Sequence, residues 1–384
     1  MVSWTKLLTG VSEDHANLRY SQNNGCVPKI VVWNITKQCN LSCRHCYFEA
    51  VRNPRASQLT RKEAEDFIED LARFNVPVLL FSGGEPLLRK DIFELGKFAK
   101  DRGIRPVLST NGTLITTKVA KKIKGGDFSY VGISLDGAEE TNDLFRQKKG
   151  SYQAALNGIK NCQQLGLKVG LRFTLTKFNF RDLPAIFELV ERESISRLCL
   201  YHLVYTGRGD NLINQDLSHQ ETRQVLELIW LKTMDFYQKG LKTEVLTVDN
   251  HADGVWIYLR FKKSDSQRAQ EILKLLEIQG GNSSGINIGA VDNQGDVYAD
   301  QFLRTHPLGN IRKRQFSEVW QDKGNSLLQA LRNRKSLLKG RCKKCKYLTI
   351  CNGNFRARAE AVFGDPWQED PACYLTDKEI SGDA

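Results

Sequence analysis

The chain has 384 residues, of which 41% are hydrophobic and 9% aromatic, which allows a substantial core and excludes a wholly disordered protein. No segment reaches the ~18 uninterrupted apolar residues of a membrane span, and no apolar run precedes the first acidic residues as in a secretory signal. We therefore expect a cytoplasmic protein without a membrane partner. Basic residues exceed acidic ones by 56 to 44, and the net charge of +12 is compatible with a nucleic acid, an acidic membrane surface or an anionic small molecule as the partner.

Strand and helix patterns alternate along the first two thirds of the chain. Apolar, β-branched segments predict strands, and apolar residues at helical spacing, such as those that follow the N-cap Thr60, predict the helices between them. The strands are predicted at 29–36, 76–82, 105–110, 130–136, 168–175 and 196–205, and the helices from Thr60 to about Phe74 and at 91–102, 118–124, 151–165 and 182–192. Short connections favour a parallel sheet with right-handed crossovers, either open and doubly wound or barrel-like, with its functional residues where the strands end.

The alternation stops after about Asp249. A polar turn at 279–285 precedes two short predicted strands, 286–292 and 296–300, and a Cys-rich tail follows. We predict four parts: an N-terminal arm at 1–28, an α/β domain at 29–250, a connecting helical segment at 251–279 and a C-terminal domain at 280–384.

Seven of the ten cysteines form two groups, one near each end of the chain. In a reducing cytoplasm such groups favour metal ligation over disulfides, whereas Cys162 and Cys199 lie in apolar patterns typical of core thiols. The first group, Cys39, Cys43 and Cys46, follows the first predicted strand directly. Three thiolates leave one iron of a cubane open to a substrate; zinc with His45 as fourth ligand is the alternative.

The CxxxCxxC loop with Tyr47 after its last cysteine resembles the radical S-adenosylmethionine (SAM) superfamily. The resemblance implies a partial (β/α)6 barrel in which these three cysteines bind a 4Fe–4S cluster, SAM chelates the open iron, and reductive cleavage gives a 5′-deoxyadenosyl radical. A low-potential donor such as ferredoxin or flavodoxin would supply the electron. The resemblance further assigns SAM contacts to residues at the strand ends: Tyr47, Gly83, Gly84, Glu85, Asn111, Ser134, Asp136, Ser151 and Arg172. An Arg in an otherwise apolar strand, as at Arg172, calls for a buried anion such as the SAM carboxylate.

The second group, Cys342, Cys345, Cys351 and Cys373, supplies four thiolates and so a site closed by protein. Taken alone it fits a zinc ribbon equally well. Beside a radical SAM barrel it resembles the SPASM/twitch-type C-terminal domain, which implies an auxiliary 4Fe–4S cluster. Eight basic residues and no acidic one lie at 331–346, around the first pair of this group.

The segments 170–176, 201–211, 280–285 and 351–373 resemble the NirJ-type radical SAM family of haem d1 biosynthesis. That resemblance implies a didecarboxysiroheme-like substrate, from which propionate side chains are removed on the route to oxo groups. Such a flat polyanion fits the positive net charge. His202 is the candidate axial ligand of the substrate iron. The other candidate substrate contacts lie near the loops and the cluster domain: Tyr205, Arg208, Arg356 and Arg358.

Three other interpretations remain open at this point. A sister enzyme of the alternative haem pathway would remove acetate groups from the same substrate, and a peptide-modifying enzyme would share the architecture. A zinc- or nucleic-acid-binding protein would fit the charge and the second cysteine group, but it leaves the open cysteine spacing and the Gly-Gly-Glu-Pro segment at 83–86 unexplained. We therefore expect no nucleic-acid partner.

Overall fold

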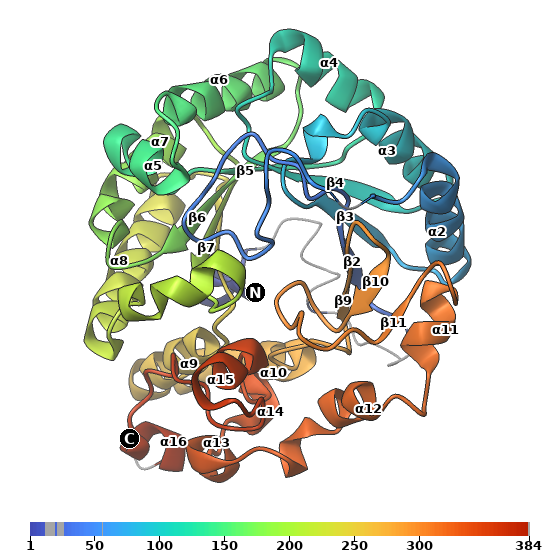
Figure 1. Cartoon of the computed structure of the whole chain (residues 1–384). Coiled ribbons are helices and arrows are strands. Elements are labelled where there is room, and N and C mark those ends of the chain that lie inside the picture. The colour runs from blue at the N-terminus through green and yellow to red at the C-terminus, as the bar shows by residue number, and fades with distance from the viewer. Residues whose placement is uncertain (12–19, 21–26, 56, 383–384) are drawn as a thin grey trace.

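The computed structural model describes residues 1–11, 20, 27–55 and 57–382. Within these residues one 11-stranded sheet has the order β1-β8-β7-β6-β5-β4-β3-β2-β9-β10-β11 (Figure 1). Its parallel strands are β2 (Ile30–Asn34), β3 (Val78–Ser82), β4 (Arg105–Thr110), β5 (Val131–Ser134), β6 (Val169–Leu175), β7 (Arg197–His202) and β8 (Glu244–Val248). The six predicted strands are confirmed as the partial barrel; β8 was not predicted.

Helices cover the outer face of the curved sheet (Figure 1). They are α2 (Arg61–Arg73), α3 (Ile92–Asp101), α4 (Thr117–Gly125), α5 (Glu139–Arg146), α6 (Ser151–Gln164), α7 (Leu183–Arg192) and α8 (His219–Gln238). The predicted N-cap is confirmed, because the Thr60 side chain accepts from Glu63 N and the Glu63 carboxylate accepts from Thr60 N. Short 3-10 turns follow three of the strands: η2 (Pro86–Leu88), η3 (Phe180–Asp182) and η4 (Gly207–Gln215).

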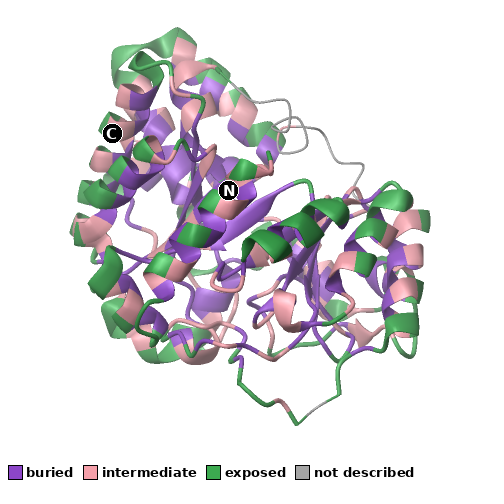
Figure 2. Ribbon diagram, turned by 90° about the horizontal axis from the view of Figure 1, so that it is seen from above, coloured by how far each residue is buried: buried purple, intermediate pink, exposed green. Residues whose placement is uncertain are grey.

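Alternate residues of each strand face opposite sides of the sheet. Val31 and Trp33 of β2 belong to the main core beneath the helices, whereas Val32 belongs to a small cluster on the inner face with Leu80 and Ala290. Figure 2 shows the buried strands surrounded by helices whose outer faces are exposed. The inner face is therefore apolar without being filled by a second layer of helices, which leaves room for cavities.

Both ends of the chain extend the barrel sheet. At the N-terminus β1 (Val2–Ser3) pairs with β8, and α1 (Trp4–Thr9) follows it. At the other edge β9 (Ile288–Val291) pairs in parallel with β2, followed by β10 (Asp296–Tyr298) and β11 (Gly309–Asn310). The strands predicted after the polar turn are thus present, in the same sheet as the barrel. The predicted division near residue 280 stays a prediction.

The remaining helices close the lower side of the molecule in Figure 1. Two of them, α9 (Ala252–Ser264) and α10 (Ser266–Gln279), precede β9. The tail contains α11 (Phe316–Gln321), α12 (Ser326–Arg332), η5 (Arg334–Ser336), α13 (Gly340–Lys344), α14 (Leu348–Cys351), α15 (Arg356–Phe363) and α16 (Asp377–Ser381). No helix in the described part of the chain is long and apolar enough to span a membrane.

Candidate active site

The three cysteines of the first group lie on the loop after β2, which crosses the carboxyl end of the barrel (Figure 1). Cys39, Cys43 and Cys46 all line one cavity of about 190 Å³. Backbone N–H groups point at two of the sulfurs: Leu41 N lies 3.4 Å from Cys39 Sγ, and Ala50 N lies 3.5 Å from Cys46 Sγ. Such N–H···S contacts are typical around iron–sulfur clusters.

Burial raises the pKa of the Cys39 thiol to about 12 and also raises the pKa of Cys43. Without a cation these thiols stay protonated, whereas a bound metal deprotonates its ligands. The three sulfurs, their N–H donors and the adjoining cavity therefore fit a cluster with one iron left open to a ligand.

Arg146 is a site residue that the sequence analysis missed. Its guanidinium forms a buried ion pair with Asp136, and Arg146 Nη1 lies 3.7 Å from Cys43 Sγ. The other Asp136 oxygen accepts from Thr174 N at 2.7 Å, so this carboxylate links β6 to the cysteine loop. In the sequence Arg146 stands at the end of an amphipathic helix, where an arginine is ordinarily interpreted as a solvated cation, so nothing local indicated its buried role.

His45, considered as a zinc ligand, stacks on Phe145 with ring centroids 4.5 Å apart and directs Nε2 toward Asp136 Oδ2 at 3.4 Å. Burial lowers the pKa of His45 to about 4, so the ring is neutral. The imidazole thus faces the Asp136–Arg146 pair.

The Gly-Gly-Glu turn after β3 lies directly against the cysteine loop. Gly83 has φ 130°, and a Cβ on Gly84 would collide with the Gln38 carbonyl, so glycine is required for this approach. Gly84 N and Glu85 N donate to the carbonyls of Thr36 and Gln38 at 2.7 and 2.8 Å. Both glycines line the cavity, as the predicted SAM contact requires.

The Glu85 carboxylate, predicted to contact SAM, points elsewhere. It is fully buried and accepts from Thr110 Oγ1 at 2.7 Å and from Asn111 N at 2.8 Å. Burial raises its pKa to about 7. Glu85 is absent from the cavity lining, so its side chain positions the end of β4 and, through it, Asn111, which does line the cavity.

The other predicted SAM contacts also fall into two groups, residues that line the cavity and residues whose side chains are bonded elsewhere. Tyr47, Ser134 and Arg172 line the cavity, and Tyr47 is fixed by donating to Asn34 Oδ1 at 2.8 Å. Ser151 does not line it, because its hydroxyl donates to Asp143 Oδ1 at 2.8 Å. Arg172 bonds through Nη1 to Ser109, while its buried Nε has no hydrogen-bond partner. An anion in the cavity would satisfy that donor.

Three predicted substrate contacts take structural roles at this end of the barrel. Arg208 donates to the carbonyls of Cys43 and Ala50 at 2.9 and 3.0 Å, so it holds the cysteine loop. His202 lines the cavity but shares a 2.9 Å hydrogen bond with Asp253. Tyr205 lies outside the cavity lining and donates to Asp216 at 2.5 Å.

Arg356 and Arg358 are buried in the C-terminal segment and line neither of the cavities described here. Arg358 pairs with Asp370 at 2.7 Å, and Arg356 Nη1 donates to the carbonyls of Pro366 and Gln368 at 2.7 and 2.6 Å. The expectation that they hold substrate carboxylates stays a prediction, because in this structure both guanidinium groups are buried and bonded to protein groups. Sequence patterns do not distinguish an arginine that binds substrate from one that satisfies backbone carbonyls.

The second cysteine group gathers around α13 and α14. Cys345 N donates to Cys342 O at 3.2 Å, and Arg341, next to Cys342, donates from Nη1 to Cys373 O at 3.3 Å. Burial raises the pKa of Cys351. Tyr347 N points at Cys345 Sγ over 3.4 Å. Four gathered thiols fit an auxiliary cluster. Among the described residues no three His, Cys, Asp or Glu side chains are arranged to hold a single metal ion.

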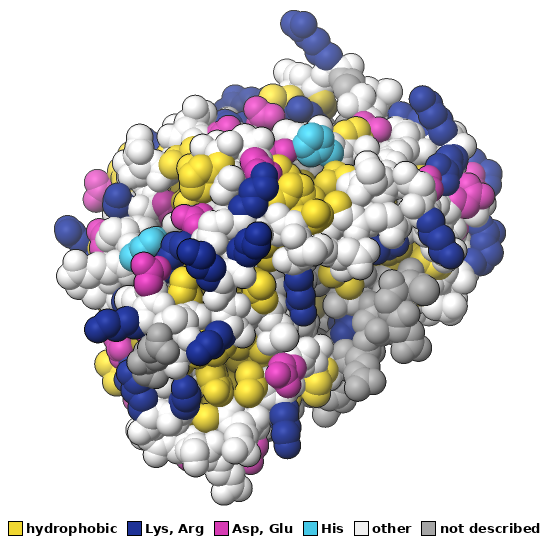
Figure 3. Space-filling view, turned by 90° about the horizontal axis from the view of Figure 1, so that it is seen from below, with side chains coloured by type: hydrophobic (Ala, Val, Ile, Leu, Met, Phe, Trp, Pro, Cys, Tyr) yellow, Lys and Arg dark blue, Asp and Glu magenta, His cyan; other side chains and the backbone are white. Residues whose placement is uncertain are grey.

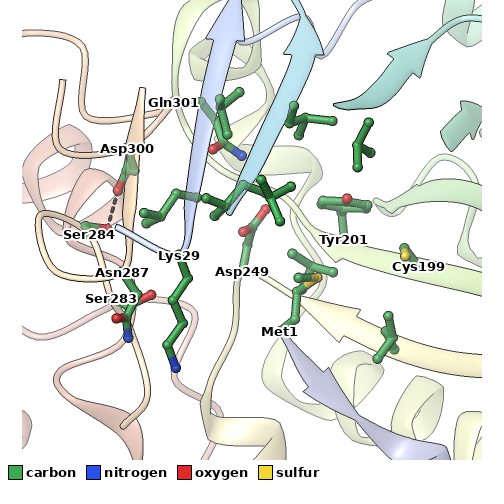
Figure 4. Close-up of a pocket in the computed structure, with 18 of the residues that line it drawn as sticks. Met1, Lys29, Cys199, Tyr201, Asp249, Ser283, Ser284, Asn287, Asp300 and Gln301 are labelled. Carbon is green, nitrogen blue, oxygen red and sulfur yellow. Dashed lines mark hydrogen bonds between the residues drawn. The ribbon is translucent and has the colours of Figure 1, made fainter. Parts of the chain in front are cut away.

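A larger cavity of about 300 Å³ lies on the inner face of the barrel beside the first one (Figure 4). The two cavities adjoin, because they share lining residues: Val32, Leu80, Arg172, Tyr201, Asp249 and Gln301. The larger one is closed on the C-terminal side by the turn after α10, whose Asn282 N donates to Cys351 O at 3.1 Å. The second cysteine group thus supports one wall of this cavity.

The family model described as the Radical SAM superfamily matches residues 33–190. Fe-coproporphyrin III synthase of Methanosarcina barkeri is 50% identical over 394 residues, 99% of this chain and 99% of that protein. Pre-heme d1 synthase of Dinoroseobacter shibae is 41% identical and the alignment covers 92% of this chain and 88% of that one. An AdoMet-dependent heme synthase of M. barkeri is 31% identical over 90% of this chain and 96% of its own length.

Solved structures support the same fold. SuiB of Streptococcus suis, bound to its precursor peptide SuiA, superposes with a TM-score of 0.72 at 19% identity over 91% of this chain and 76% of that chain. The enzyme anSMEcpe with bound AdoMet superposes with a TM-score of 0.70 at 20% identity over 92% of this chain and 96% of that chain. Together with the identity over nearly the whole length of the first relative, these findings establish that the chain belongs to the radical SAM superfamily.

Proposed function

We propose that this enzyme removes acetate side chains from a didecarboxysiroheme-like iron tetrapyrrole and forms an Fe-coproporphyrin III-type product. The observation that carries the proposal is the 50% identity to an Fe-coproporphyrin III synthase over 99% of both chains. The identity to a pre-heme d1 synthase is lower and covers less of both chains. Acetate removal therefore takes precedence over the propionate removal that the NirJ-type resemblance implies.

The described residues fit the cofactors of such a reaction. Cys39, Cys43 and Cys46 would hold a 4Fe–4S cluster, and SAM would lie in the adjoining cavity against Gly83, Gly84 and Arg172. When bound, cluster and SAM supply the one-electron chemistry that removes a hydrogen atom from the substrate. The chain's own part is to fix the cysteine loop through Arg208 and Arg146, to orient SAM and to exclude water.

The second cysteine group would hold an auxiliary 4Fe–4S cluster at the wall of the larger cavity. A low-potential ferredoxin or flavodoxin would deliver electrons. The basic surface does not point to a nucleic acid: on the face shown in Figure 3, Lys and Arg side chains are dispersed among acidic ones.

The haem d1 reaction is the second candidate, favoured by the 41% identity to a pre-heme d1 synthase. A peptide-modifying reaction has weaker support, because the mycofactocin maturase of Mycolicibacterium smegmatis is 32% identical and aligns with 82% of its length.

Product analysis decides between these reactions. Cluster-replete protein is incubated without oxygen with SAM, a reductant and didecarboxysiroheme, and the tetrapyrroles are analysed by mass spectrometry. We expect a product that has lost its acetate groups and kept all its propionates. Loss of propionates would establish the haem d1 reaction instead, and an unchanged tetrapyrrole despite SAM cleavage would overturn both. The matched control is the Cys39→Ala/Cys43→Ala/Cys46→Ala variant, which should yield no product.

A further inference from the structure

Four basic residues line the larger cavity at the amino-terminal edge of the barrel. Lys29 immediately precedes β2, Arg105 begins β4, Lys168 precedes β6, and Arg197 begins β7. Because these strands are parallel neighbours or near neighbours, their starts lie at one edge, opposite the cysteine loop. We call these four residues the basic ring. In Figure 4 Lys29 extends alongside Ser283 and Asn287, away from Gln301.

The wall between the basic ring and the cysteine cavity is apolar and aromatic. It is formed by inward-facing residues of successive strands: Ile30, Val32, Val78, Leu80, Val107, Leu246 and Val248, with Tyr130 and Tyr201. An apolar wall with cations at one end suits a ligand that has a flat hydrophobic body and carboxylates on its edge.

The charges of the basic ring are crowded and partly removed from water. Burial lowers the pKa of Lys29, and burial together with the neighbouring Arg197 lowers the pKa of Arg105. Arg197 already binds Glu244, with Nε 2.7 Å from Oε2. Additional anions at this edge would stabilise the charged forms of Lys29 and Arg105.

Two polar groups with no hydrogen-bond partner lie at the opposite end, where the two cavities adjoin. They are Arg172 Nε and Asp249 Oδ2, and the Asp249 side chain is only 7% exposed. Buried polar atoms without partners indicate a place that a polar ligand group occupies. The larger cavity therefore offers ligand contacts at both ends.

We propose that the basic ring binds propionate carboxylates of the tetrapyrrole, so that the macrocycle lies along the apolar wall and its opposite edge reaches the junction with the cysteine cavity. This inference rests on the proposed function and adds the orientation of the substrate. It explains how a substrate that carries several carboxylates presents one edge for reaction: the carboxylates that are kept anchor it at the far edge of the barrel.

The test is a titration of cluster-replete protein with two iron porphyrins, followed by their Soret absorbance. Fe-coproporphyrin III carries four propionates, whereas iron etioporphyrin carries ethyl groups in their place and no carboxylate. Wild-type protein should bind Fe-coproporphyrin III more tightly. Lys29→Gln/Lys168→Gln should weaken that binding by about a hundredfold, since it removes two charged pairs and each lost pair costs about one order of magnitude. Etioporphyrin binding should be the same in wild type and in this variant, because that porphyrin has no carboxylate for the basic ring to hold. The matched control with the same loss of charge is Lys118→Gln/Lys121→Gln, on the exposed side of α4.

Two outcomes separate the inference from the proposed function. If wild-type protein binds Fe-coproporphyrin III and the two double variants bind it equally well, the basic ring does not hold propionates. If wild-type protein binds neither porphyrin, the proposed function fails and the inference with it. Iron content and SAM affinity of each variant verify that it is folded. If Lys29→Gln/Lys168→Gln loses its clusters, two other variants test the same point. Lys29→Arg/Lys168→Arg keeps the charges and should keep the affinity for Fe-coproporphyrin III, whereas Arg105→Gln removes a charge and should lose affinity.

Discussion

Arg208 Nε donates to the Cys43 carbonyl oxygen at 2.9 Å, although 165 residues separate the two in the chain. The contact is possible because Gly207, with φ 60°, passes so close to the cysteine loop that a Cβ there would lie 2.5 Å from the Tyr47 carbonyl oxygen. The Gly-Arg-Gly segment after β7 therefore holds in place the loop that carries Cys39, Cys43 and Cys46, and we refer to it as a clamp on that loop.

Arg208→Lys should reduce the iron bound by the first cysteine group and slow SAM cleavage. Lysine cannot donate to the carbonyls of Cys43 and Ala50 in the planar geometry of arginine, and each charge-assisted bond contributes about 1.5–3 kcal/mol. Iron content and anaerobic SAM cleavage measure the effect. Arg192→Lys, an exposed residue paired with Glu193, is the control. Full iron content in Arg208→Lys would show that the clamp is dispensable.

The two cysteine groups should make separable contributions. On the reading of two 4Fe–4S clusters, wild-type protein holds about eight irons per chain. Cys39→Ala/Cys43→Ala/Cys46→Ala should hold about half of them and cleave no SAM. Cys342→Ala/Cys345→Ala should keep some SAM cleavage but lose tetrapyrrole turnover, because the second group supports the cavity wall at Asn282. Zinc in place of iron in either preparation contradicts the assignment.

Arg358 and Asp370 should behave as a buried structural pair. Both side chains are fully buried, and Asp370 also accepts from Phe355 N at 2.9 Å. Arg358→Met leaves a buried carboxylate without its cation, which typically costs about 3–5 kcal/mol of unfolding free energy. In denaturant unfolding, the double variant Arg358→Met/Asp370→Asn should lose less unfolding free energy than the sum of the losses of the two single variants. A stable Arg358→Met with weakened porphyrin binding would instead restore the substrate role predicted from the sequence.

Because of Asp249, the free energy of unfolding should decrease as pH rises from about 4 to about 7. Burial raises the pKa of this carboxyl to about 7, well above the ~3.9 of an unfolded aspartate. In this interval the folded state binds more protons than the unfolded state, so the free energy of unfolding falls as pH rises. Asp249→Asn lacks this titration.

The measurement is denaturant unfolding of wild type and Asp249→Asn at several pH values. The difference in stability between them should shift in favour of Asn as pH rises from about 4 to about 7 and should level off above pH 7. A difference independent of pH would show that Asp249 titrates normally.

The order of strands and helices could be predicted because each strand is an apolar run of ordinary length and each helix has one apolar face. The strand β8 was missed because it has only five residues and two of them, Glu244 and Thr247, are polar, so it forms no continuous apolar run. Its place in the sheet is determined by pairing with β7 and β1, which only the tertiary structure provides.

The sequence by itself determined the chemistry: the spacing of Cys39, Cys43 and Cys46 and the glycines after β3 are local features, and local spacing limits what a loop can bind. The direction in which each polar side chain points was decided only by the tertiary structure. Glu85, Arg208 and Arg358 are buried, and a buried charged group must find its partners wherever the surrounding backbone places them. Those partners lie 25, 165 and 12 residues away along the chain, at distances that no local pattern encodes.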